Sequence, residues 1–181
     1  GIIFPANTLN KIFITNIQWN NVKKVIMEMR YISVQSGTNN GIIVLSGAVS
    51  HTTTNAYNPV AWLKTDNTIA GVTAAFTCDT TYSQLITTEK RILTINVTSI
   101  SANGNNFLSF PQWSDASYSP RMAIYKVSLY GSDNTLLSEC IGVKSGTVID
   151  GNAATSNCFY DTVGKSFLTK LNCNELEAEE L

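Results

Sequence analysis

The chain has 181 residues, of which 44% are hydrophobic and 14% are charged, and its formal net charge is -1. This length and apolar content suffice for one domain with a hydrophobic core, which excludes a disordered chain. The 12 Lys and Arg residues are scattered, so we expect no nucleic-acid partner, because phosphates need clustered basic side chains. No apolar run approaches the roughly 18 residues that span a bilayer, so we expect no membrane insertion.

The composition favours an all-β fold. Asn, Ser and Thr supply roughly a third of the chain, whereas helix-forming Glu and Lys are sparse. Alternating apolar residues predict about a dozen strands, and no spacing typical of helices separates them. The predicted strands cover Lys11–Ile17, Val22–Val34, Gly41–Leu45, Ala61–Lys64, Thr68–Cys78, Lys90–Ile100, Phe107–Phe110, Met122–Tyr130, Leu136–Val143, Asn157–Tyr160 and Lys165–Lys170.

Polar segments between these strands predict turns and loops. Asn20-Asn21 and Asn103–Asn106 are predicted turns, and His51–Asn58 and Pro111–Pro120 are predicted long loops. The segment 174–181 holds four of the seven glutamates and is interpreted as a solvated tail or a short helix, with an acidic docking tail as the alternative. The predicted organisation is therefore one domain over residues 1–173 followed by an acidic tail.

Two strands have faces that can be assigned from the sequence. In the predicted strand Val22–Val34, one face comprises Val25, Met27, Met29 and Tyr31, and the other comprises Ile26, Glu28, Arg30 and Ile32. In Met122–Tyr130, strict alternation places Met122, Ile124, Lys126 and Ser128 opposite Ala123, Tyr125, Val127 and Leu129. The apolar content of this strand predicts a central position in its sheet.

The last third of the chain carries a pattern that resembles a known family. Met122–Tyr130 is followed by Leu136-Leu137 and Cys140, and then by the segment from Cys158 to Phe167. This order resembles the closing strands of laminin-G-like, concanavalin A-like lectin domains, particularly those of bacteriophages and gut bacteria. The opening strands, Lys11–Ile17, Val22–Arg30 and Gly41–Gly47, also fit that family, although a proline usual near Cys140 is absent.

The resemblance implies a two-sheet antiparallel jelly-roll sandwich. It also implies that loops at one edge of the sandwich bind glycans or partner proteins. Because functions on this fold are diverse, the resemblance by itself supports only an adhesive or structural role.

The residue pattern does not favour an enzyme. A glycoside hydrolase needs two carboxylates held at a defined separation, whereas Glu28, Glu89 and Glu139 stand alone in the sequence. Glu28 is expected to pair with Arg30 on its own strand. The single histidine, His51, lies beside threonines with no acidic residue to orient it.

Cofactor and metal signals are weak. No cofactor is expected, and calcium is the one metal left open, through Asp133-Asn134 or Asp150-Gly151-Asn152. Both segments are also ordinary turn sequences, which is the preferred interpretation, and Asp161 is interpreted as a hairpin cap. The four cysteines form no zinc pattern. Free buried thiols are preferred to disulfides, and Cys140 with Cys158 is the first pair to test.

Two loops offer the groups that glycan recognition uses, an aromatic ring beside amides and carboxylates. The first candidate site comprises Gln112, Trp113, Asp115 and Tyr118, and the second comprises Asn55, Tyr57 and Asn58, near Trp62. Trp62 is alternatively a core residue.

These observations predict a non-catalytic module of a virion or an extracellular surface. Its expected partners are a glycan or cell-surface receptor and other virion or surface proteins, as in phage fibre or decoration proteins. Phage fibres are commonly trimeric, and low charge suits packing between copies, so a homotrimer is included. The alternatives are a purely structural surface protein without a sugar site and, last, a glycoside hydrolase.

Overall fold

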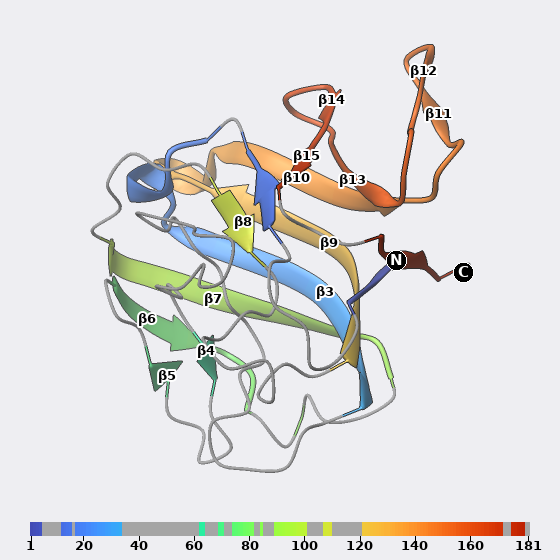
Figure 1. Cartoon of the computed structure of the whole chain (residues 1–181). Helices are drawn as coiled ribbons and strands as arrows, with labels where there is room; N and C mark the ends of the chain where they lie inside the picture. The colour runs from blue at the N-terminus through green and yellow to red at the C-terminus, as the bar shows by residue number, and fades with distance from the viewer. Residues whose placement is uncertain are drawn as a thin grey trace.

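The computed structural model of the chain describes residues 1–4, 12–15, 17–33, 62–63, 69–70, 74–81, 84, 89–100, 107–109, 121–171 and 175–179. Over these residues the protein is all-β, as the composition predicts, and the paired strands run antiparallel (Figure 1). The predictions for Gly41–Leu45, His51–Asn58, Asn103–Asn106 and Pro111–Pro120 lie outside the described residues.

The strands are β1 (Ile2–Phe4), β2 (Ile12–Ile14), β3 (Lys24–Ser33), β4 (Trp62–Leu63), β5 (Ile69–Ala70), β6 (Ala74–Cys78), β7 (Arg91–Ile100), β8 (Phe107–Ser109), β9 (Arg121–Tyr130), β10 (Leu136–Val143), β11 (Val148–Ile149), β12 (Asn152–Ala153), β13 (Cys158–Asp161), β14 (Ser166–Phe167), β15 (Thr169–Leu171) and β16 (Glu177–Ala178). Two short 3₁₀ turns accompany them, η1 (Trp19–Asn21) and η3 (Ser132–Asn134).

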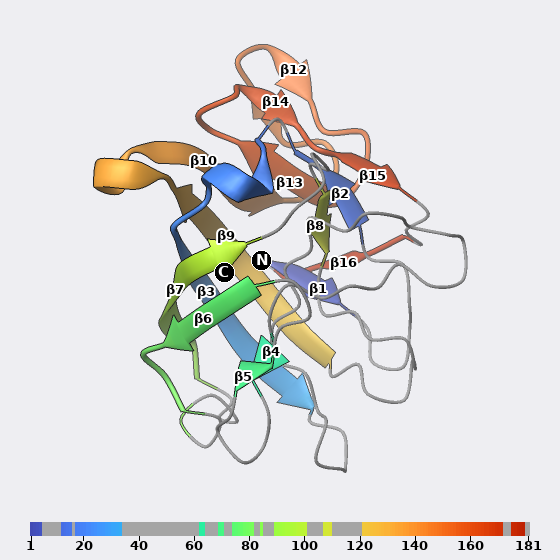
Figure 2. The same cartoon turned by 90° about the vertical axis from the view of Figure 1, so that its left-hand side faces the viewer.

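A nine-stranded sheet organises the molecule (Figures 1 and 2). Seven of its strands follow the order β14-β13-β10-β9-β3-β7-β6, so β9 is central, as its apolar sequence predicts. One edge of β9 is shared, because β10 pairs with its second half and β1 pairs with Met122 to Ile124. Smaller sheets are formed by β15-β2-β8, β11-β12 and β4-β5.

Residues of β3 alternate between core and surface as predicted. Val25, Met27, Met29 and Tyr31 are buried, whereas the residues between them are partly exposed. Because successive side chains of a strand point to opposite faces, one face of β3 contributes four side chains to the core.

Strict alternation fails in β9 because the strand contains a bulge. Glu28 is opposite Lys126 whereas Met29 is opposite Ile124, so Tyr125 is an extra residue without a partner on β3. The bulge reverses the face that the following residues occupy. The core-facing residues opposite β3 are therefore Met122 and Ile124 before the bulge, and Val127 and Leu129 after it.

Three phenylalanines join the main sheet to the sheet β15-β2-β8. The ring of Phe13 in β2 lies edge-on to Phe159 in β13 at a centroid distance of 5.0 Å. Phe4 in β1 stacks on Phe159 at 6.2 Å, and all three rings are fully buried. Such aromatic contacts add to the free energy gained by burying the rings.

Two predictions at the end of the chain are corrected. The predicted strand Lys165–Lys170 is two strands, β14 and β15, which belong to different sheets. Residues 175–179 are neither a solvated tail nor a helix, because β16 pairs with β1 and Leu176 is buried. The apolar Leu176 and Ala178 alternate with glutamates, which is the period of a strand.

Cys140 and Cys158 are free, buried thiols, as preferred from the sequence. Burial raises the pKa of Cys140 to about 12, and burial also raises the pKa of Cys158. The side chain of Cys78 and the whole of Cys173 lie outside the described residues.

Candidate functional site

The predicted ligand contacts lie outside the described residues, namely Asn55, Tyr57, Asn58, Gln112, Trp113, Asp115 and Tyr118. Of Trp62 the structure describes the backbone, which pairs with Ala70. Cavities and polar surfaces among the described residues offer other candidate sites.

A polar groove lies at one end of the main sheet, between η1 and the connection from β9 to β10, which lie side by side in Figure 1. We call it the end groove. Its volume is about 440 Å³, within the range of small-ligand sites. Six polar side chains line it above Gly131 and Leu137, namely Asn20, Asn21, Lys23, Ser132, Asp133 and Thr135.

Leu137 lines the end groove, and its position depends on a second bulge, which lies in β10. Leu136 is opposite Tyr130 and Ser138 is opposite Leu129, so Leu137 is the extra residue in β10. A Cβ atom at Gly131 would lie 3.3 Å from Leu137 Cδ1, which is closer than ordinary packing. Glycine at position 131 therefore lets Leu137 pack against the turn.

Backbone hydrogen bonds hold both walls of the groove. Gly131 N donates to Thr135 O at 2.8 Å, which closes the β9–β10 connection around η3. On the other wall, Lys23 N donates to Tyr130 O at 2.7 Å, and Lys23 O accepts from Val97 N at 2.8 Å. The backbone of Lys23 is thereby fixed between β9 and β7.

A side-chain brace connects the two walls. Lys24 Nζ donates to Asn134 Oδ1 at 2.7 Å and lies 4.6 Å from the centroid of the Tyr130 ring. Asp133 and Asn134 both have φ of 56°, a left-handed conformation that Asp and Asn tolerate better than most residues. The brace holds η3 in this conformation next to the groove.

The six polar side chains of the groove are exposed, and their hydrogen-bonding groups are free for a ligand. Among the residues that the structure describes, none of the six donates or accepts a side-chain hydrogen bond or joins an ion pair. They comprise amides, hydroxyls, one ammonium and one carboxylate, so the groove offers both donors and acceptors.

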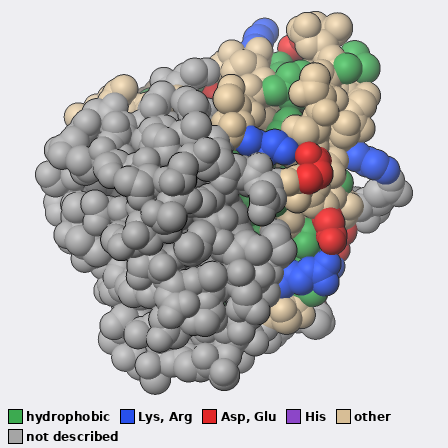
Figure 3. Space-filling model, viewed as in Figure 1, with side chains coloured by type: hydrophobic (Ala, Val, Ile, Leu, Met, Phe, Trp, Pro, Cys, Tyr) green, Lys and Arg blue, Asp and Glu red, His purple; other side chains and the backbone are tan. Residues whose placement is uncertain are grey.

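The outer face of the main sheet contrasts with the groove because its charges are paired. Glu28 lies 3.5 Å from Lys90 Nζ and 3.8 Å from Lys126 Nζ. Lys126 Nζ also lies 3.9 Å from Glu139, which accepts hydrogen bonds from the hydroxyls of Ser128 and Thr162. On the face seen in Figure 3, acidic and basic side chains of the described residues are interspersed.

Arg30 does not pair with Glu28, contrary to prediction. Arg30 Nε instead donates to Glu179 Oε1 at 2.9 Å and to the Tyr125 hydroxyl at 3.1 Å, and that hydroxyl donates to Glu179. The hydrogen bond from Arg30 is the main cause that lowers the pKa of Glu179. Sequence reasoning missed this contact because it treated the segment of Glu179 as a tail.

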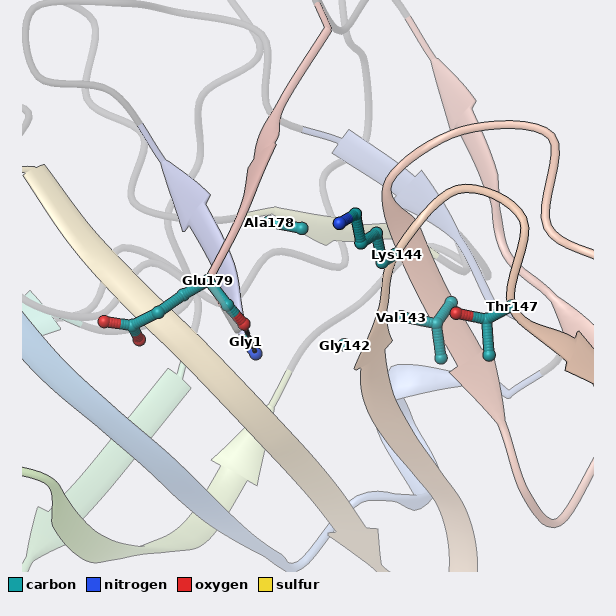
Figure 4. A pocket seen from close by; sticks show the side chains of 7 residues that line it. All are labelled: Gly1, Gly142, Val143, Lys144, Thr147, Ala178 and Glu179. Carbon is teal, nitrogen blue, oxygen red and sulfur yellow. Dashed lines mark hydrogen bonds between the residues drawn. The ribbon is translucent and has the colours of Figure 1, made fainter. Parts of the chain in front are cut away.

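A second cavity of about 410 Å³ lies where β10 diverges from β9 beside β1 (Figure 4). The carboxylate of Glu179 points away from Lys144 and Thr147 in that view, toward the contacts with Arg30 and Tyr125 described above. Much of the remaining lining comes from Gly142, Val143 and Ala178. This cavity therefore presents fewer free polar side chains than the end groove.

The turn interpretations of the two calcium candidates are confirmed. Asp150 and Gly151 have φ of 51° and 79° and connect β11 with β12, while Asp150 Oδ2 accepts from the Tyr160 hydroxyl at 2.9 Å. Asp161 caps its hairpin by accepting from Val163 N at 3.0 Å. Among the described residues, no three His, Cys, Asp or Glu side chains gather in a way that could hold a metal ion.

The sequence predicts the two turns that line the end groove, but it does not predict that they lie next to each other. Each of the doublets Asn20-Asn21 and Asp133-Asn134 predicts a turn, and their separation of more than 100 residues gives no reason to connect them. One feature of the sequence does point to the groove, because both doublets adjoin the ends of predicted strands. Polar residues in the loops at strand ends can serve recognition.

Comparisons of the chain with known protein families, curated proteins and solved structures found no match. Within the described residues, no helix has the length and apolar character to cross a membrane.

Proposed function

We propose that this chain is a non-catalytic adhesion or receptor-binding module of a virion or an extracellular surface, with the end groove as a glycan-binding site. The proposal includes a jelly-roll sandwich as the overall fold. It also includes assembly with other surface proteins or with copies of the chain. The chemistry of the groove supports this assignment.

The main support for the proposal is a contrast between two surfaces. The polar side chains that line the end groove have no side-chain partner among the described residues, whereas the charged side chains on the outer face of the main sheet form ion pairs. Exposed polar side chains that line one concavity and have no intramolecular partner are available to a ligand rich in hydroxyls. The amides of Asn20 and Asn21 can donate to and accept from sugar hydroxyls, and the carboxylate of Asp133 can accept from two of them. The backbone hydrogen bonds that hold both walls lower the entropic cost of binding.

The loop residues predicted from the sequence extend the same proposal. Trp113 and Tyr57 would supply aromatic rings for stacking on a sugar, which the described lining of the groove lacks. Whether either loop adjoins the groove stays a prediction.

Binding to a glycan array, followed by calorimetry on the bound glycans, tests the proposal. Asn21→Ala and Asp133→Ala should each weaken binding at least tenfold, which corresponds to about 1.4 kcal/mol. Asn96→Ala is the matched control, because Asn96 is an exposed amide on β7 outside the groove. If Asn96→Ala weakens binding as much as the groove variants do, the groove is not the site.

The alternative is a structural surface protein, which the paired charges on the outer sheet face favour. In that case the wild-type protein binds no glycan and no cells but still assembles with its partner proteins. Trials on polysaccharides test the remaining alternative, a hydrolase.

A further inference from the structure

The charged groups of the end groove are not balanced by internal ion pairs. Lys23 and Asp133 both line the groove, and neither forms an ion pair with another described residue. By contrast, several basic side chains elsewhere on the main sheet lie within 4 Å of a carboxylate, among them Arg30, Lys126 and Arg121. The ammonium of Lys23 is therefore available to an anionic ligand.

A second positive charge lies next to the groove. Lys24 Nζ is held by the neutral Asn134 side chain and the Tyr130 ring, and no acidic side chain among the described residues offsets its charge. Among the described residues that line or adjoin the groove, the two ammonium groups of Lys23 and Lys24 outnumber the one carboxylate, that of Asp133. The net positive charge at the groove therefore attracts an acidic ligand and repels a cation.

Position as well as net charge restricts the ligand. Lys23 belongs to the wall before β3, and Asp133 belongs to the opposite wall in η3. An anionic group would be attracted by Lys23 and repelled by Asp133, whereas Asp133 accepts hydrogen bonds from neutral hydroxyls. The two walls would therefore orient a ligand that carries an anion at one end and hydroxyls at the other.

We infer that the end groove selects acidic glycans, in which a sugar carboxylate or sulfate pairs with Lys23 while sugar hydroxyls bind Asp133 and the neighbouring asparagines. This inference rests on the proposed glycan-binding function and names its ligand class. Lysine is a point charge without the planar fork of arginine, so the side chain does not distinguish carboxylate from sulfate.

The test compares each acidic glycan with a neutral counterpart of the same sugar sequence. The probes are uronic and sialic acid oligosaccharides with their methyl esters, and sulfated oligosaccharides with their desulfated forms. At least one acidic glycan should bind at least tenfold more tightly than its neutral counterpart, and added salt should reduce that preference. Which of the two sets binds distinguishes carboxylate from sulfate.

The variants assign the preference to one residue. Lys23→Gln should remove the preference, so that the acidic glycan and its neutral counterpart bind with similar affinity. Lys165→Gln is the control, because Lys165 is exposed on the hairpin between β13 and β14, away from the groove. Circular dichroism and thermal unfolding should show that both variants fold as the wild type does.

The outcomes separate this inference from the proposed function. If acidic and neutral glycans bind equally and Asp133→Ala abolishes binding, the glycan-binding function stands and the acidic selection is wrong. If the acidic preference survives in Lys23→Gln, the charge that selects the ligand lies elsewhere and the inference is also wrong. If the wild type binds none of the probes, both proposals fail.

Discussion

Tyr125 and Arg30 meet because of an irregularity in the central strand. The bulge makes Tyr125 an extra residue of β9, and its hydroxyl accepts a hydrogen bond from Arg30 Nε at 3.1 Å. Both side chains also bind Glu179, so the last described segment is held to the main sheet. A strand that follows the hydrophobic period without interruption would place Tyr125 elsewhere.

Removing the cation of this contact should destabilise the fold. Arg30→Met is expected to lower the free energy of unfolding by about 1–2 kcal/mol, because Glu179 and the Tyr125 hydroxyl lose a charged partner. Urea unfolding measures the change. Arg121→Met is the matched control, since Arg121 pairs with Glu177, which belongs to the same segment 175–179 as Glu179. The side chains of Arg121 and Glu177 are 40% and 69% exposed, against 25% and 20% for Arg30 and Glu179. The control should cost less than about 1 kcal/mol, and an equal loss in both variants would contradict the special role of Arg30.

Acid should weaken the same contact. The pKa of Glu179 is lowered in the folded protein, mainly by the hydrogen bond from Arg30. Because the pKa of Glu179 is lower in the folded protein than its unfolded value of 4.5, the carboxylate stabilises the folded protein at pH values above 4.5. This contribution is lost as pH falls through the folded pKa. Thermal unfolding of Glu179→Gln followed below about pH 5 should therefore vary less with pH than unfolding of the wild type. Identical pH dependence in the two proteins would show that Glu179 is not linked to stability.

The face assignment of β9 can be tested at Val127. This side chain is completely buried in the central strand, so Val127→Asp places an unpaired carboxylate in the core. The cost is several kcal/mol against a total stability of about 5–15 kcal/mol, so soluble folded protein should be lost. Val148→Asp is the control, because Val148 is 64% exposed and its substitution should leave the yield unchanged. Folded Val127→Asp protein at the wild-type yield would refute the assignment.

The buried thiols should react only after unfolding. Burial raises the pKa of Cys140 to about 12, so almost no thiolate exists near neutral pH in the folded protein. A thiol reagent should leave Cys140 and Cys158 unmodified in the native state and modify both once the protein is denatured without reductant. We expect Cys78 and Cys173 to react in the denatured protein as well. Mass spectrometry counts the modifications, and a denatured protein with fewer than four would indicate a disulfide.

Trp113→Ala tests the loop predicted from the sequence. If the indole contacts a ligand, the substitution should weaken binding at least tenfold, about 1.4 kcal/mol, and leave the melting temperature nearly unchanged. Calorimetry and thermal unfolding measure the two effects. A loss of stability of about 3 kcal/mol or more would instead identify Trp113 as a core residue.

The sequence alone determined the all-β class, most of the described strands and the buried face of β3. These features follow from a period of two residues, which is local and can be counted along the chain. The bulge at Tyr125 is also local, but its sequence continues the alternation on both sides of it, so only the pairing of Glu28 with Lys126 and of Met29 with Ile124 reveals it.

Contacts between distant residues were decided by the tertiary structure. Lys24 meets Asn134 across 110 positions and Arg30 meets Glu179 across 149, and no local pattern encodes which polar groups become neighbours. The end groove arises in the same way, because antiparallel pairing of β3 with β9 brings η1 beside η3. Its polar residues resemble ordinary turn residues in the sequence. Only packing shows that their side chains face one concavity and have no side-chain partner among the described residues.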